Sequence, residues 1–148
     1  WFVHADAQPL PDSAETVIRI LDAGAQGGYF RFGLTGERTV LKILTEWSVA
    51  LRCRFGGIPY GDQGLFVRRE AYVQVGGHLS APLFEEARLV RRLRNMGGFN
   101  GIDVPIGVNP ERWDQEGYLK RGLKNRLIVL AYWMGVSPWR LARWYSGS

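Results

Sequence analysis

The stretch from Tyr29 to Gly57 decides the fold class, and it reads YFRFGLTGERTVLKILTEWSVALRCRFGG. In its first part, large apolar side chains alternate with Arg31 and Gly33, which is the period of a strand with one wetter face. From about Glu37 the apolar residues recur at helical spacing, which predicts a long helix that ends near Gly57. A strand followed directly by such a helix is typical of a layered α/β structure.

Strand and helix signals continue to alternate on both sides of this stretch. Before it, the apolar run at 1–4 predicts a buried strand, and Asp12 or Ser13 can cap a helix that runs to about Leu21. After it, we expect a strand at 65–67, a helical turn at 69–75, a helix at 83–96, a strand at 102–108, and helices at 116–134 and 137–145. Pro105 confines the strand at 102–108 to a sheet edge or a bulge. The prediction is an α/β mixed sheet flanked by helices, with a helical C-terminal tail.

Length and composition predict one domain without a membrane span. The chain has 148 residues, of which 46% are hydrophobic, enough for a core in one domain and too few for two. The longest apolar run, at 127–136, is about half the length that a spanning helix needs. Cys53 is the only cysteine, and no signal-peptide pattern opens the chain. We therefore expect a reducing, cytoplasmic location.

The net charge of +5 is concentrated in the tail. From Gly117 onward there are six basic residues and no acidic one, which leaves 13 basic and 14 acidic residues before it. Basic charge, clustered aromatics and a leucine stripe resemble a helix at a membrane interface. The alternative is a terminal helix that packs on the sheet with a basic outer face. No recognised motif indicates nucleic-acid binding, so we expect no nucleic-acid partner.

Asp6 is a candidate metal ligand. It follows the expected strand at 1–4, so its carboxylate should lie at the carboxyl edge of the sheet, where open α/β sheets bind ligands. A carboxylate there can hold Mg²⁺ or Mn²⁺, which keep several waters and take further oxygens from substrate phosphates. The alternative is an ordinary turn or cap residue. His4 lies on the same side of the expected strand, either near Asp6 or as a satisfied core histidine.

The segment Gly56–Gly64 has the composition of a binding loop. It combines flexible glycines with a phenol, a carboxylate and an amide, from Tyr60, Asp62 and Gln63. The alternative is a turn in which Asp62 caps backbone amides.

Glu86 is a candidate general base. On a wheel of the helix at 83–96 it lies in the middle of the face that carries Val90 and Leu93, while Glu85 lies to one side. A carboxylate on an inward face is costly unless it is hydrogen-bonded or lines a cleft. Burial raises the pKa of such a group and the helix N-terminus lowers it. The alternative is that Glu86 only accepts hydrogen bonds from the free backbone amides at the start of the helix.

Arg112 and Trp113 form a further candidate pair after the Asn109-Pro110 turn. A fork-shaped cation beside an aromatic surface suits diphosphate binding and sugar stacking. A surface arginine beside a core tryptophan is the alternative.

Taken in order, these segments resemble family 2 glycosyltransferases, and most of all the bacterial subgroup named for its association with radical-SAM and selenoprotein genes. The resemblance spans nearly all 148 residues. It is carried by the strand that ends in His4-Ala5-Asp6, the block GIPYGDQGLFVRR at 57–69, Gly76-Gly77, Glu85-Glu86 and Arg112-Trp113.

The resemblance implies a GT-A fold, with the acceptor and metal side at 1–115 and an amphipathic helical tail at 116–148 packed on the same domain. Asp6 would be the surviving carboxylate of an Asp-x-Asp type motif, with His4 in the place of the first Asp. It would bind a divalent cation, Mn²⁺ or Mg²⁺. Glu86 would match the family's base, a position where Asp is usual, and Glu85 is a second candidate.

The implied reaction is the inverting transfer of a sugar from a nucleotide-sugar donor to an unknown acceptor. Tyr60, Asp62 and Gln63 would bind substrate, and Arg112-Trp113 matches the end of a Gln-x-x-Arg-Trp motif. Relatives begin with a nucleotide-binding half that would precede residue 1, so we expect an incomplete fragment that is inactive by itself. The alternative function is a noncatalytic module that uses residues 118–145 at a membrane interface. The protein would then be peripheral to the inner face of the membrane.

Overall fold

The sheet is built on two parallel strands, β2 (Gly27–Leu34) and β4 (Phe99–Val108). In the computed structural model, which describes residues 1–146, two short strands complete it: β1 (Ala7–Gln8) pairs antiparallel with β4, and β3 (Phe66–Val67) pairs antiparallel with β2. The strand order is β1-β4-β2-β3. The predicted α/β mixed sheet flanked by helices is confirmed.

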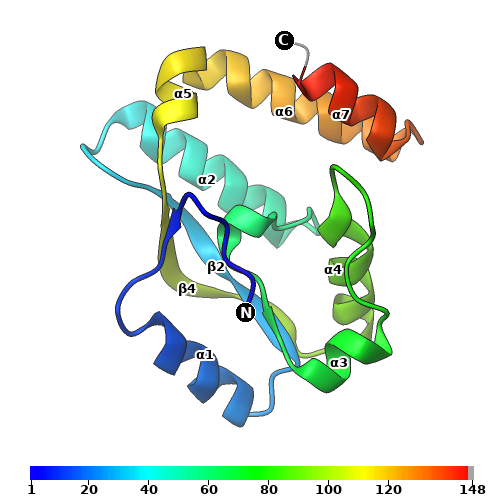
Figure 1. Cartoon of the computed structure of the whole chain (residues 1–148). Coiled ribbons are helices and arrows are strands. Elements are labelled where there is room, and N and C mark those ends of the chain that lie inside the picture. Colours follow the sequence, from blue (N-terminus) through cyan, green and yellow to red (C-terminus); the bar gives the residue numbers. More distant parts are fainter. Residues whose placement is uncertain (147–148) are drawn as a thin grey trace.

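The helices lie on both sides of this sheet. Figure 1 shows α1 below it and α2 above it, with α5, α6 and α7 forming an upper layer. Their bounds are α1 (Ser13–Asp22), α2 (Val40–Arg54), α3 (Arg69–Gln74), α4 (Glu85–Met96), α5 (Glu111–Glu116), α6 (Tyr118–Trp133) and α7 (Pro138–Ser146). A short 3-10 turn, η1 (Gly61–Gln63), follows α2.

Strand β2 has the two faces that its sequence predicts. Phe30, Phe32 and Leu34 are buried, whereas Arg31 is exposed. In the register with β4, Phe30 pairs with Ile102 and Arg31 pairs with Pro105, so two residues of β4 have no partner on β2. Because β4 lies between β1 and β2, Pro105 is accommodated by a bulge and not by an edge position.

The largest core cluster lies around α4. Leu89, Val90 and Leu93 are buried there together with Phe99 of β4 and Leu141 of α7. Partly buried residues of α6 pack against the same cluster: Ile128, Val129, Ala131 and Tyr132. Helix α4 is therefore one of the elements through which the upper helical layer packs on the sheet domain.

The expectation of a strand at 1–4 is wrong. These residues form no strand and are exposed to solvent, and the first strand begins at Ala7. The segment is held by a hydrogen bond from the Phe2 amide to the Leu65 carbonyl (2.8 Å) and by aromatic contacts, in which Trp1 stacks on Phe30. A short run of apolar residues alone does not distinguish a buried strand from a loop whose aromatic side chains pack on aromatic side chains of the domain.

The expected helix at 116–134 is present as α6, which begins two residues later than predicted. Gly117 has φ +82°, a left-handed conformation that interrupts the helix and separates α5 from α6. Arg112 and Trp113 lie in α5, a short helix that the sequence did not predict. No helix within residues 1–146 is long and apolar enough to cross a bilayer.

Candidate functional site

Glu86 lies in the first turn of α4 and points into the protein, as its helical spacing predicts. It is 4% exposed, and its Oε1 accepts a hydrogen bond from the Gly61 amide at 2.7 Å. Burial, and then the neighbouring charge of Glu85, raise the pKa of Glu86 from 4.5 to about 7, against the lowering effect of backbone hydrogen bonds. A carboxylate with this pKa can take up a proton near neutral pH.

The start of α4 is fixed by Phe84. This residue adopts the left-handed conformation (φ 58°, ψ 28°), which is unfavourable for a residue with a side chain. Its ring is buried and stacks on Tyr132 of α6, with the centroids 4.2 Å apart and the planes at 18°. Ring packing therefore compensates for the backbone conformation that directs Glu86 inward.

A pocket of about 450 Å³ opens beside Glu86. Its lining residues are Trp1, Phe2, Val3, His4, Gly61, Leu65, His78, Glu85 and Glu86. The two histidines of the chain both lie in this lining. Sequence reasoning overlooked His78, although the scarcity of histidine was a signal that could have drawn attention to it.

Gly61 allows the groups of this pocket to approach one another. A Cβ at this position would lie 2.9 Å from His4 Nε2 and 3.1 Å from Glu86 Oε1. Because Gly61 has no side chain, the His4 imidazole and the Glu86 carboxylate can both approach its backbone closely. His4 also lies beside Asp6, with 3.6 Å between Nδ1 and Oδ1.

Asp62 is the second carboxylate with an unusual environment. Its Oδ1 is shielded from solvent and has no hydrogen-bond partner among the described residues. Burial raises the pKa of Asp62 from 3.8 to about 6, while the nearby charges of Arg52 and His4 lower it and that of Asp6 raises it again. Asp62 therefore lies within electrostatic reach of both His4 and Asp6.

Asp6 lies near the carboxyl ends of the parallel strands by a different route from the expected one. It precedes β1, and its carbonyl accepts a hydrogen bond from Asn109, the residue after β4, at 3.3 Å. Within residues 1–146, no three His, Cys, Asp or Glu side chains form a metal-binding group. Asp6 and Asp62 are two carboxylates that interact electrostatically, and Mg²⁺ sites commonly use only one or two carboxylates together with water and phosphate oxygens.

Tyr60 and Gln63 flank Asp62 but have different surroundings. The Arg52 guanidinium lies 4.4 Å from the centre of the Tyr60 ring. Gln63 is buried, donates to the Phe30 carbonyl (3.2 Å) and accepts from the Cys53 thiol (3.4 Å). Both ends of its amide are engaged, so Gln63 fastens η1 to β2.

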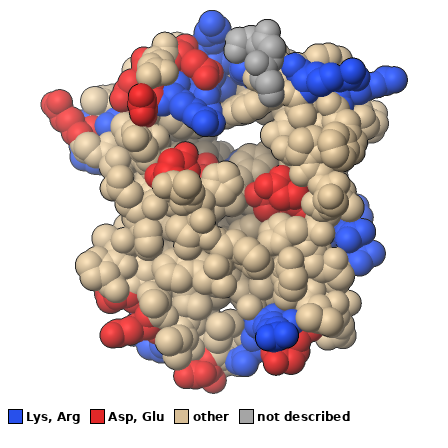
Figure 2. Space-filling model, viewed as in Figure 1, with Lys and Arg blue, Asp and Glu red and all other residues tan. Residues whose placement is uncertain are grey.

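A groove of about 830 Å³ runs between α2 and α6. Tyr60, Asp62 and Trp113 line it, so it brings together three of the predicted substrate-binding residues. In Figure 2 the surface is hollowed below the upper helical layer, with acidic side chains on the rim of the hollow. Arg112 is exposed on α5 and does not line this groove.

Trp113 is held as part of the wall of this groove. It stacks on Tyr118 with 5.9 Å between the ring centres, and the Arg121 guanidinium lies 5.3 Å from its ring. It also packs against the buried cluster of Phe32, Leu34 and Val108. The aromatic half of the Arg112-Trp113 pair is therefore fixed by core packing.

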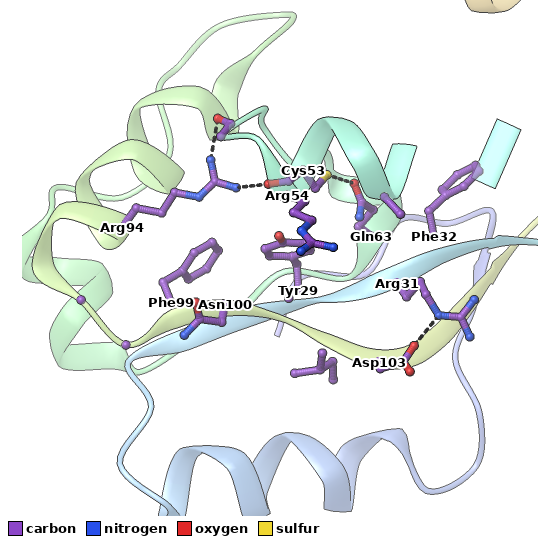
Figure 3. Close-up of a pocket in the computed structure, with 16 residues that line it drawn as sticks. Tyr29, Arg31, Phe32, Cys53, Arg54, Gln63, Arg94, Phe99, Asn100 and Asp103 are labelled. Carbon is purple, nitrogen blue, oxygen red and sulfur yellow. Dashed lines mark hydrogen bonds and ion pairs between the residues drawn. The ribbon is translucent and has the colours of Figure 1, made fainter. Parts of the chain in front are cut away.

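A third cavity, of about 930 Å³, lies by the carboxyl ends of α2 and α4 (Figure 3). Arg94 enters it from α4 and donates to the carbonyls of Cys53 (3.3 Å), Gly56 (2.7 Å) and Gly57 (3.0 Å). Arg94 therefore anchors the loop after α2. Of the predicted site residues, Gln63 alone lines this cavity.

Comparison of the chain with protein-family models, with curated proteins and with solved structures finds no match in any of the three.

Proposed function

We propose that this chain is the acceptor and metal side of a glycosyltransferase that moves a sugar from a nucleotide-sugar donor to an acceptor hydroxyl with inversion. The observation that supports this most is the state of Glu86. Its carboxyl group is buried, lines a pocket and has a pKa that is raised to about 7. A general base works best when its pKa lies near the working pH, because an ionised fraction is then present and the proton is still held well, and a pKa of about 7 meets this condition.

The chain's residues divide the chemistry as follows. Glu86 takes the proton of the acceptor hydroxyl while the acceptor oxygen bonds to the anomeric carbon and the bond from that carbon to the donor diphosphate breaks. The Gly61 amide holds the Glu86 carboxylate in position through its 2.7 Å hydrogen bond. Glu85 lines the same pocket, and its charge helps keep the pKa of Glu86 high.

The departing diphosphate needs positive charge. A divalent cation, when bound by Asp6 with Asp62 nearby, would offset the negative charge that develops on it. His4 lies beside Asp6 and can orient its carboxylate. Tyr60 and Trp113 offer aromatic surfaces in the adjoining groove, against which a sugar ring can stack.

Two measurements test the proposal. UDP and GDP are titrated calorimetrically into the chain with and without Mn²⁺, and we expect weak binding that requires the metal and is lost in Asp6→Ala. Transfer or hydrolysis of nucleotide-sugars is then compared between Glu86→Gln and Glu85→Gln, each in a form of the chain joined to a nucleotide-binding half. We expect Glu86→Gln to lower kcat about 10²- to 10⁴-fold, the usual contribution of a general base, and Glu85→Gln to lower it far less.

The pH profile separates a base from a structural carboxylate. If Glu86 is the base, kcat/KM rises with pH through a midpoint near 7, because only the ionised form accepts the proton. Nucleotide binding that ignores both the metal and Asp6→Ala would contradict the proposal, and so would equal loss of activity in Glu85→Gln and Glu86→Gln.

A further inference from the structure

Helix α2 presents its apolar face to solvent. Leu44 and Trp47 are exposed, and Phe55, just after the helix, is 78% exposed. The polar side chains of Lys42 and Glu46 face the protein and are buried. This is the reverse of a surface helix in a globular protein, where the apolar face covers the core.

Helix α6 carries a second exposed apolar face on the other side of the same groove. Leu119 is 81% exposed and Leu123 is 60% exposed. The apolar residues of both helices that are exposed and line the groove are here called the α2–α6 surface: Leu41, Leu44, Leu51, Phe55, Leu119, Leu123, Leu130 and Trp133. Contiguous apolar surface of this kind marks an interaction site in most water-soluble domains.

The positive charge beside this surface favours a partner with negative charge. Arg126 lines the groove, and both Arg126 and Lys120 of α6 are exposed. No acidic residue follows Glu116 in the sequence. Figure 2 shows Lys and Arg side chains over the upper helical layer. Exposed leucine and tryptophan beside cations fit a bilayer interface that carries negative headgroups.

We propose that the α2–α6 surface docks on the surface of an anionic lipid bilayer, with its apolar side chains among the acyl chains and the cations of α6 at the headgroups. The sequence drew attention to the tail alone, whereas the structure adds α2 as the second half of the docking surface. Tyr60 and Asp62 line the same groove, so docking would bring that groove to the membrane. The inference does not rest on the proposed transfer chemistry.

Vesicle sedimentation tests the apolar part of this surface. The chain is mixed with vesicles of phosphatidylcholine alone or of phosphatidylcholine with phosphatidylglycerol, and we expect binding to the anionic vesicles. The double variant Leu119→Ser/Leu123→Ser should lose this binding. The matched control is Ile18→Ser/Val73→Ser, which removes apolar side chains of similar exposure (58% and 69%) from α1 and α3 and should bind normally.

A charge pair tests the electrostatic part. Each cation near an anionic surface strengthens binding roughly fivefold, so Lys120→Gln/Arg126→Gln should weaken it by about 25-fold. Arg19→Gln/Arg91→Gln, which removes two exposed cations from α1 and α4, is the control. Binding should also weaken as salt is added.

Three outcomes would overturn the inference. The first is no binding to anionic vesicles by the unaltered chain, and the second is equal binding by the Leu119→Ser/Leu123→Ser variant and its control. The third concerns a second copy of the chain as the occupant. If sedimentation without lipid shows a dimer that Leu119→Ser/Leu123→Ser dissociates, and vesicles do not compete with it, the α2–α6 surface is an interface between copies.

Discussion

Helices α2 and α4 contact the same sheet in opposite ways. Helix α4 turns Leu89, Val90 and Leu93 toward the core, with one buried carboxylate, Glu86, among them. Helix α2 turns Lys42 and Glu46 inward and leaves its leucines outside. Each helix is amphipathic in sequence, but the groups available at its contact with the sheet decide which face is buried.

For α2, the deciding groups lie at the end of β2. The Leu34 amide donates to Glu46 Oε1 at 2.7 Å, Arg38 Nη1 bonds to the same carboxylate, and Lys42 Nζ donates to the Thr35 carbonyl at 2.7 Å. A strand end leaves backbone groups that need partners when they are buried. The polar face of α2 supplies them, and its apolar face remains for another partner.

The largest expected effect comes from the core face of α4. Leu93→Ala removes a fully buried side chain and should lower the free energy of unfolding by about 2–5 kcal/mol, because a cavity remains. Urea unfolding followed by circular dichroism measures this. The matched change in α2, Leu44→Ala, should cost far less, and equal costs would show that α2 buries its apolar face in solution.

The buried carboxylate of α4 should make stability depend on pH. Its folded-state pKa of about 7 lies above its ordinary 4.5, so the folded chain binds the proton more tightly and stability falls as the pH rises between these values. The loss reaches about 3 kcal/mol above pH 7. Glu86→Gln removes this part of the pH dependence and keeps an acceptor for the Gly61 amide.

Unfolding curves at a series of pH values compare Glu86→Gln with the unaltered chain. Asp62, with its pKa raised to about 6, contributes a similar fall at lower pH in both proteins, so most of its contribution cancels in the difference, and what remains is its coupling to Glu86. A difference that does not change between pH 4 and pH 8 would mean that Glu86 is accessible to water in solution.

The polar face of α2 gives a third, smaller effect. Glu46→Ala leaves the buried Leu34 amide without its acceptor and should cost about 1–3 kcal/mol. Glu37→Ala, an exposed acid before the same helix, serves as the control and should change little. If Glu46→Ala proves as mild as Glu37→Ala, the backbone at the end of β2 finds other partners.

The smallest effect is expected on the outer face of α2. Trp47→Ser replaces a large exposed ring and should change the free energy of unfolding by no more than about 0.5 kcal/mol. Thermal unfolding in the absence of lipid is the measurement. A loss as large as that of Leu93→Ala would place Trp47 in a buried contact that α2 makes in solution.

These helices also show how much sequence reasoning can recover. Periodicity and caps predicted that α1, β2, α4 and α7 exist, and the wheel of α4 placed Glu86 inward. Spacing alone could not decide the inward face of α2, because the answer depends on the end of β2 as a partner. The sequence did not predict the helix break at Gly117, because a single glycine within a helical pattern is often tolerated.

The candidate site was recovered to a similar extent. The carboxylates Asp6, Asp62 and Glu86 were singled out one by one, and the structure places Asp62 within electrostatic reach of both other groups. The approach of His78 to the same pocket and of Arg52 to Tyr60 depends on tertiary packing. Such contacts join segments that are distant in sequence, so no local pattern encodes them.

The stacking of Phe84 on Tyr132 links the proposed base to the upper helical layer. Phe84 keeps a left-handed backbone that costs about 1–2 kcal/mol, and the ring of α6 is what compensates for it. A shift of α6 would release Phe84 and let the first turn of α4 relax, which would carry Glu86 away from the Gly61 amide. The orientation of the Glu86 carboxylate thus depends on the position of α6, through the ring of Phe84.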